Sequence, residues 1–157
     1  MKLLKKILFA LVILLAIAQF FGPEKNLGNL ESVNAFLAET NPPENVKAIL
    51  KESCFDCHTN TTRYPWYSNI TPINYWLAEH IKDGKKDLDF STWDDNSVKR
   101  KDHKFEEIIE MVEQREMPLP SYTYTHSEAK LSDSQIQEII EWANQVRLGY
   151  VLVPLPE

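Results

Sequence analysis

Cysteine and glycine are scarce in this sequence. Its 157 residues contain two cysteines, Cys54 and Cys57, and four glycines. A disulfide between cysteines only three residues apart would close a very short loop and constrain little of the chain, so we do not expect one to stabilise the fold. There is no Gly-rich phosphate loop, no internal repeat and no low-complexity tract. One globular domain with a small extension is the expected organisation.

Basic residues are scarce outside the N-terminus. The formal net charge is −6, and the first 21 residues contain three lysines and no acid, so the remaining 14 basic and 23 acidic residues give −9. An acidic body of this kind is a poor binder of nucleic acid. We therefore expect no nucleic-acid partner.

Residues 1–21 begin with lysines and continue as an unbroken apolar run from Ile7 to Ala18. This pattern predicts a signal peptide or an N-terminal membrane anchor. The segment Ala16-Ile17-Ala18 resembles a cleavage site, whereas residues 7–21 would form a helix of about 22 Å, shorter than the roughly 30 Å hydrocarbon core of a bilayer. Both fates stay open. Both place the rest of the chain on the periplasmic side of the bacterial inner membrane, either anchored or soluble.

Residues 22–41 mix polar residues with glycine and proline, which predicts a tether and puts the domain at 42–157. In that domain apolar residues recur at helical spacing, and no segment alternates with period two, so we expect an all-α fold. Trp76 and Trp142 lie on apolar helix stripes and are expected in the core. The expected helices run from Pro43 to about Cys57, from Thr71 and Pro72 to Gly84, from about His103 to Arg115, and from the capping pair Ser132 and Gln135 to about Leu148.

The residues Cys54-Phe55-Asp56-Cys57-His58 match the pattern of c-type haem attachment. Residues i, i+3 and i+4 share one face of a helical turn. Two thiols on that face can form thioethers with the two vinyl groups of a porphyrin, while the His58 imidazole binds the iron axially. The pattern predicts one covalently attached haem c per chain. A haem would also serve as a core for the long loops at residues 59–70, 85–102 and 118–131.

Two other uses of the cysteine pair are disfavoured. A thioredoxin-like redox pair needs a preceding strand and a βαβ context, which the sequence lacks. A structural zinc site needs further ligands at similar spacing, and there is no other cysteine.

The sixth iron ligand has several candidates. Met117 precedes "PLP", whose prolines favour an extended segment that can hold a thioether over the iron, and methionine with histidine raises the reduction potential of an electron carrier. His80 lies on the apolar stripe of the second helix, and His126 lies in a polar loop. A core methionine, a hydrogen-bonded core histidine and an open site are the alternatives.

Arg63, Tyr64 and Trp66 follow the attachment motif closely. They can form a wall of the haem pocket, with Arg63 or a tryptophan N–H bonding a propionate. Ordinary packing of a loop by aromatic side chains explains them equally well, so both interpretations stay open.

From Cys54 onward the chain resembles the bacterial haem-binding domain family, which comprises small membrane-associated proteins similar to c-type cytochromes. The resemblance rests on "CFDCHTNTTRYPWYSNITPINYWLAEHIKDGKKDLDFSTW" and "EMPLPSYTYTHSEAKLSD" and covers roughly residues 41–144. It implies covalent haem at Cys54 and Cys57, with His58 as the proximal ligand, and a redox role. More distantly the layout is similar to class I cytochrome c, which implies Met117 as the sixth ligand. The aromatic loop after His58 and residues 83–100 depart from that class.

The sequence therefore predicts a small cytochrome c-like helical domain packed around one covalent haem. The expected function is single-electron transfer between redox protein partners in the periplasm, with no catalytic residues. The alternatives are a haem enzyme or gas sensor with an open or displaceable sixth ligand, and a docking subunit of a larger redox complex.

Overall fold

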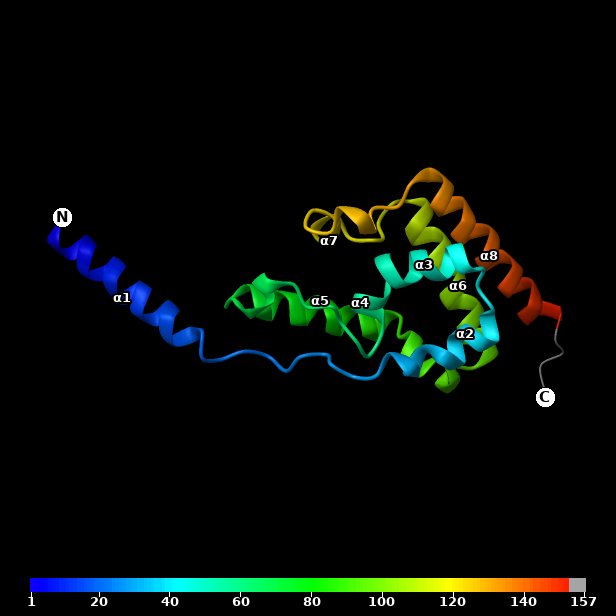
Figure 1. Ribbon diagram of the computed structural model, residues 1–157, viewed down its shortest axis with the longest axis horizontal. Coiled ribbons are helices and arrows are strands. Elements are labelled where there is room, and N and C mark those ends of the chain that lie inside the picture. Colours follow the sequence, from blue (N-terminus) through cyan, green and yellow to red (C-terminus); the bar gives the residue numbers. More distant parts are fainter. Residues whose placement is uncertain (153–157) are drawn as a thin grey trace.

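The computed structural model describes residues 1–152, and among these it contains helices and no strands, which confirms the all-α prediction (Figure 1). The α-helices are α1 (Lys2–Ala18), α2 (Asn34–Thr40), α3 (Glu44–Ser53), α4 (Phe55–His58), α5 (Ile73–Asp87), α6 (Val98–Glu113), α7 (Pro120–Thr123) and α8 (Asp133–Leu152). Short 3-10 helices lie between them: η1 (Leu30–Val33), η2 (Trp66–Asn69), η3 (Phe90–Asp95) and η4 (Ser127–Ala129).

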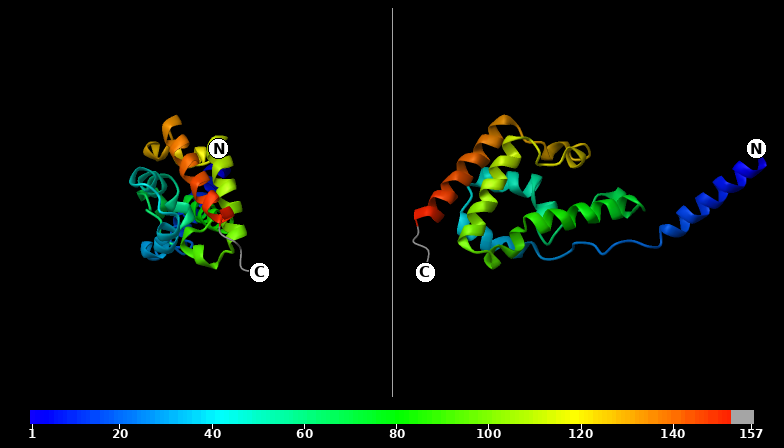
Figure 2. Two further views of the ribbon diagram at one scale, coloured as in Figure 1. Left: turned by 90° about the vertical axis from the view of Figure 1, so that its right-hand side faces the viewer. Right: turned by 180° about the vertical axis from the view of Figure 1, so that it is seen from behind.

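The C-terminal helix α8 begins as its capping signal predicts. The Ser132 amide donates to Oε1 of Gln135 over 2.9 Å, and the Gln135 amide donates to Oγ of Ser132 over 3.3 Å. This reciprocal pair satisfies amides that the first turn of a helix leaves without partners. Helix α8 then packs along α6, and the two lie side by side in both views of Figure 2.

Helix α5 differs from its prediction at both ends. Thr71 does not cap it, because its hydroxyl donates to the carbonyl of Phe21 over 3.1 Å, and the helix begins at Ile73. Gly84 does not end it, and α5 continues to Asp87. A glycine stops a helix only where the backbone turns left-handed, and Gly84 keeps its helical conformation here.

Residues 30–40 belong to the packed domain, although the sequence assigned them to the tether. Val33 and Phe36 are buried in the main core cluster, with Phe36 fully buried. Lys101 of α6 donates to Glu39 of α2 over 2.6 Å. The sequence prediction missed this because α2 has only seven residues, which is too few to show helical periodicity. Its one large buried side chain, Phe36, therefore gave no recognisable pattern.

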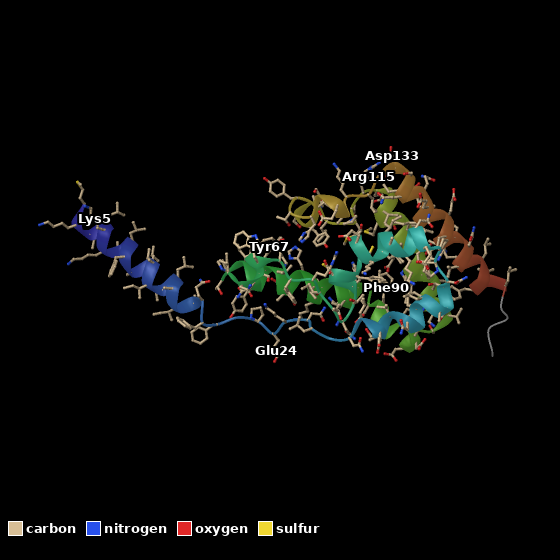
Figure 3. The ribbon with its side chains drawn as sticks, viewed as in Figure 1. Lys5, Glu24, Tyr67, Phe90, Arg115 and Asp133 are labelled. Carbon is tan, nitrogen blue, oxygen red and sulfur yellow. The ribbon has the colours of Figure 1, made fainter. Side chains whose placement is uncertain are left out.

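The core consists of two clusters of buried side chains. The first gathers residues of α2, α3, α4, η3, α6 and α8 and includes Trp142 and Phe90, which lies among these elements in Figure 3. The second gathers residues of α3, α6 and α8 with Leu131, and Ile108 packs against both clusters. Trp142 is a core residue as predicted, whereas Trp76 is 47% exposed. The prediction fails for Trp76 because the N-terminal half of α5 extends beyond the other helices (Figure 1).

The apolar helix α1 stands apart from the domain, and none of its residues is buried (Figures 1 and 2). Hydrogen bonds fasten its C-terminal end to the start of α5: Gln19 Nε2 donates to the Thr71 carbonyl over 3.2 Å, and the Thr71 amide donates to Gln19 Oε1 over 3.0 Å. Among residues 1–152, no helix combines the length and the apolar character needed to cross a membrane.

Candidate functional site

The attachment motif lies at a break in the helix: Cys54 is the non-helical residue between α3 and α4, and the other four residues form α4. The sequence predicted helix up to about Cys57, but α3 ends at Ser53 and Cys54 has φ −123° and ψ −41°, outside the helical region. The amide of His58 donates to the Cys54 carbonyl over 3.0 Å, which closes the single turn of α4. Because of this break, α4 does not continue α3, but Cys54, Cys57 and His58 still lie on one turn.

The hydrogen bonds of His58 fix its tautomer. Its Nδ1 lies 2.9 Å from the carbonyl oxygen of Leu88 and 3.0 Å from that of Gly84. Carbonyl oxygens only accept, so Nδ1 carries the proton and Nε2 keeps a free lone pair. Burial lowers the pKa of His58, although both carbonyls and nearby Asp87 and Asp89 oppose this. A neutral imidazole with a free Nε2 is the form that binds a metal.

Gly84 allows α5 to approach the motif this closely. A Cβ at position 84 would lie 3.0 Å from the carbonyl oxygen of Cys57 and 3.3 Å from its Cβ. The same residue supplies one of the two carbonyls that accept from His58. The sequence signal was interpreted as a helix stop, whereas the glycine serves helix packing.

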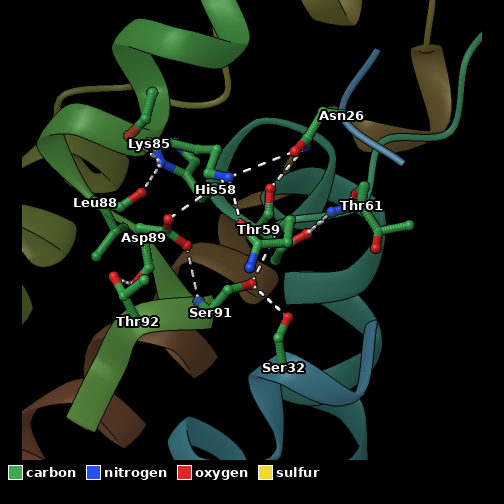
Figure 4. A network of polar contacts seen from close by, with 12 residues as sticks. Asn26, Ser32, His58, Thr59, Thr61, Lys85, Leu88, Asp89, Ser91 and Thr92 are labelled. Carbon is green, nitrogen blue, oxygen red and sulfur yellow. Dashed lines mark hydrogen bonds and ion pairs between the residues drawn. The ribbon is translucent and has the colours of Figure 1, made fainter. Parts of the chain in front are cut away.

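Polar contacts surround the outer side of His58, as Figure 4 shows. Lys85 lies beside Asp89 at 3.7 Å and also donates to Asn60. Ser91 accepts from the Asn60 amide over 2.9 Å and from Ser32 over 2.7 Å. These contacts fasten the chain after the motif to η1 and η3, and thereby hold α4 in place.

The two thiols are free and largely shielded from water. Burial raises the pKa of Cys54 to about 12, with a further contribution from Cys57. Burial likewise raises the pKa of Cys57 to about 11, with a further contribution from Asp56. Both sulfurs are therefore protonated at neutral pH. No group of three or more His, Cys, Asp or Glu side chains in residues 1–152 is arranged to hold a metal ion by itself.

A cavity of about 250 Å³ lies between the two core clusters and brings together Cys54, His58 and Met117. Its walls are mainly apolar, and Lys104 is the one cation among the described residues that line it. Its other lining residues are Leu50, Asp87, Leu88, Phe90, Glu107, Ile108, Met111, Val112 and Ile139. The cavity is lined by an imidazole and a thioether, which can both bind a haem iron, and by one of the two thiols. Cys57 is not among the lining residues, although it lies on the same turn as Cys54 and His58.

Met117 is held where the chain leaves α6. Arg115 takes a left-handed conformation with φ 58°, and the amides of Glu116 and Met117 both donate to the carbonyl of Met111, over 2.9 and 3.1 Å. Arg115 also pairs with Asp133 at the start of α8, and Figure 3 shows the two side by side. Met117 lines a second cavity as well, of about 390 Å³, together with residues of α7 and α8.

The two histidines considered as sixth ligands are not among the lining residues of the cavity that contains His58. The His80 ring packs against Trp76 with ring centroids 4.2 Å apart and the planes tilted by 51°, and its Nδ1 lies 2.9 Å from the Trp76 carbonyl. His126 stacks on Tyr122 at 4.3 Å. Both histidine rings therefore contact residues of their own helix or loop, away from the cavity that His58 lines.

Arg63, Tyr64 and Trp66 do not line that cavity either. Arg63 is paired with Asp56 and Glu52. The Tyr64 hydroxyl accepts from the Asn26 amide over 2.7 Å, and Trp66 is 78% exposed. The structure thus gives Arg63 carboxylate partners within the protein, where the sequence suggested a propionate.

Comparison with known proteins places the chain in a family. A family model described as a haem-binding domain matches residues 13–145. The chain belongs to the haem-binding domain family. Membership of the haem-binding domain family supports haem as the cofactor. No curated protein and no solved structure gives a significant match.

Four residues of the site were not singled out from the sequence: Gly84 behind His58, Lys104 in the cavity, and Asp56 and Tyr122 beside the motif. Only Asp56 carried a local signal, because an acidic side chain between two cysteines must find a partner if the motif is buried. The other three depend on contacts between distant segments.

Proposed function

We propose that the protein is a monohaem c-type cytochrome that transfers single electrons, with His58 and Met117 as the axial ligands of the iron. The observation that carries the proposal is the single cavity lined by Cys54, His58 and Met117, in which His58 Nε2 is left free by the hydrogen bonds of Nδ1. The haem supplies one-electron redox chemistry when bound.

The spacing of the two free thiols, Cys54 and Cys57, supports covalent attachment. Cys54 and Cys57 would hold the haem through thioethers, each thiol adding its sulfur to one carbon of a vinyl group and its hydrogen to the other. Atoms and electrons balance in this addition, and no oxidant is consumed. Cys54 and Cys57 must be reduced for the step, and both are free thiols in the structure.

Methionine at the sixth position suits electron transfer, because His/Met ligation raises the reduction potential of a haem. Met117 is favoured over Met111, which also lines the cavity, because Met111 lies within α6 whereas Met117 lies on the segment that leaves it. His80 and His126 remain alternatives only if the loops rearrange around the haem.

Lys104 is the side chain we expect to pair with a haem propionate. It lines the cavity, its side chain is only 15% exposed, and it already holds Glu107 at 2.6 Å. A buried carboxylate requires a cation or several hydrogen bonds. Arg63 is less suited to this role because it does not line the cavity and two carboxylates, Asp56 and Glu52, already pair with its guanidinium.

The lysine-rich, apolar N-terminal segment supports a location on the periplasmic side of the bacterial inner membrane, with the segment either anchoring the protein or removed. Redox proteins are the expected partners, one as electron donor and one as acceptor. A haem enzyme or gas sensor is the second candidate. It is favoured by one observation, the 390 Å³ cavity beside Met117, into which the thioether could swing to open the sixth position.

Visible spectroscopy and mass spectrometry of the purified protein test the proposal together. One haem retained after denaturation shows covalent attachment. A low-spin spectrum in both oxidation states, a weak far-red band of the methionine–iron bond, and slow binding of carbon monoxide support a closed electron carrier. High-spin iron with rapid carbon monoxide binding would instead support the sensor or enzyme.

A further inference from the structure

Asp56, the residue directly before the second cysteine, contacts Arg63 just after the motif and Tyr122 of the distant helix α7. Asp56 is buried, with 6% of its surface exposed. Its Oδ1 accepts from the amide of Arg63 over 3.0 Å and from Nε of Arg63 over 3.1 Å. Its Oδ2 accepts from the hydroxyl of Tyr122 over 2.7 Å. The carboxylate is therefore fully hydrogen-bonded by one residue after the motif and one residue of α7.

Arg63 supplies the positive charge that stabilises the buried carboxylate of Asp56. Its Nη1 donates to Glu52 Oε1 over 2.9 Å, and its Nη2 donates to the Glu52 carbonyl over 3.1 Å. The guanidinium is thus oriented by α3 on one side and by Asp56 on the other. A buried carboxylate is stable only when paired and hydrogen-bonded in this way.

Tyr122 joins Asp56 to the segment that carries Met117. Its amide donates to the carbonyl of Leu119 over 2.9 Å, so its position is tied to the backbone that follows Met117. Two other side-chain bonds tie residues 122–129 to the surroundings of the motif: the exposed bond from the Tyr67 hydroxyl to Thr125 Oγ1 over 2.9 Å, and the bond from the Ser53 hydroxyl to the Ala129 carbonyl over 3.0 Å. Of the three, the bond from Tyr122 to Asp56 is the one that reaches the attachment helix α4 itself.

We propose that Asp56 is a positioning residue which, through Tyr122, holds the Met117 segment against α4 and so limits how often Met117 leaves the iron. This inference rests on the proposed function. Covalent attachment of the haem does not require Asp56 or Tyr122. In this proposal their hydrogen bond lets the side of the haem that carries His58 influence how firmly Met117 stays bound on the other side. The cavity on the far side of Met117 is where the thioether would move when the bond is broken.

The experiment compares two tyrosine-to-phenylalanine variants of the full-length haem-loaded protein. Tyr122→Phe removes the bond to Asp56 and leaves the ring. Tyr124→Phe makes the same change two residues away, at a side chain that is 90% exposed. Imidazole added to the oxidised protein competes with Met117, so its apparent affinity reports the fraction of protein with the ligand released.

A hydrogen bond to a charged acceptor is worth roughly a ten- to hundredfold change in an equilibrium. We therefore expect imidazole to bind Tyr122→Phe about ten- to a hundredfold more tightly than the wild type, and Tyr124→Phe to match the wild type. Amide hydrogen exchange over residues 117–125 should quicken in Tyr122→Phe by a similar factor. Asp56→Asn, which keeps the shape of the side chain, should shift both readouts in the same direction.

Unchanged imidazole affinity and unchanged exchange in Tyr122→Phe would overturn the proposal, as would equal shifts in Tyr124→Phe. A wild type without the far-red methionine band would overturn the proposed ligation instead. In that case hydrogen exchange still decides whether Tyr122 holds the segment, so the two failures are distinguishable. If Tyr122→Phe does not fold, the Asp56→Asn variant gives the same decision.

Discussion

Replacing Gly84 with alanine tests whether the close approach of α5 to the attachment motif supports His58. The new Cβ would lie 3.0 Å from the Cys57 carbonyl oxygen and 3.3 Å from the Cys57 Cβ. Cys57 has little room to move, because its chain is closed into the turn of α4 and a thioether would fix its side chain. Helix α5 must therefore shift by a few tenths of an ångström, together with the carbonyls that accept from His58.

The expected free-energy change combines two opposing effects. Overpacking costs about 1–3 kcal/mol, whereas alanine is preferred over glycine inside a helix by about 1 kcal/mol. Gly84→Ala should therefore destabilise the protein by roughly 0–2 kcal/mol. Gly149→Ala is the matched control, because a Cβ there meets nothing within 4 Å in the exposed part of α8. It should stabilise the protein by about 0.5–1 kcal/mol.

Denaturant unfolding of the oxidised protein measures both changes, and a redox titration adds an independent readout. A longer bond from His58 Nδ1 to Gly84 makes the imidazole a weaker donor to ferric iron, so the reduction potential of Gly84→Ala should rise, while that of Gly149→Ala stays constant. If Gly84→Ala proves as stabilising as Gly149→Ala and leaves the potential unchanged, the contact does not support His58 and the reasoning is refuted.

Three further outcomes are expected. Met117→Ala should abolish the far-red band and lower the reduction potential by a sizeable part of the roughly 0.8 V that axial ligands control, whereas Met111→Ala should change neither; a redox titration of both variants checks this. Lys104→Gln should lower the potential by up to about 60 mV, because it removes a cation beside the haem, and an unchanged potential would contradict the propionate pairing. Protein prepared without haem should lose stability as the pH rises from 9.0, the ordinary thiol pKa, to about 12, because unfolding lets Cys54 and Cys57 ionise. Denaturation at several pH values should show a smaller loss once thioethers replace the thiols, because only groups such as Tyr122 and Tyr150, whose pKa values burial also raises, then still ionise on unfolding.

The prediction of the attachment motif from sequence depended on local spacing. Cys54, Cys57 and His58 lie within one turn, so no tertiary information was needed to group them. Met117 was identified through the restriction that Pro118 places on it, which is also local, and the structure brings it to the same cavity. The all-α fold followed in the same way from the spacing of apolar residues.

Contacts between distant segments could not be predicted from the sequence. For Arg63 the sequence left open a haem propionate or ordinary loop packing, and its partner Asp56, inside the motif, was not foreseen. Phe36 anchors α2 in the core from a segment whose composition is typical of a tether. Gly84 has the same sequence signal whether it ends a helix or lets another helix approach.

The arrangement of the two core clusters explains why the sixth ligand needs a separate support. Phe55 and Phe90, beside the motif, belong to the first cluster, whereas Val112 and Leu131, on either side of the Met117 segment, belong to the second. A haem held by His58 and Met117 would cross-link the two clusters and close a loop of about sixty residues, whose ordering entropy opposes the bond. Packing that already orders the chain between His58 and Met117 lowers this cost: Ile108 contacts both clusters, and the bond from Tyr122 to Asp56 is a direct connection from the Met117 segment back to α4.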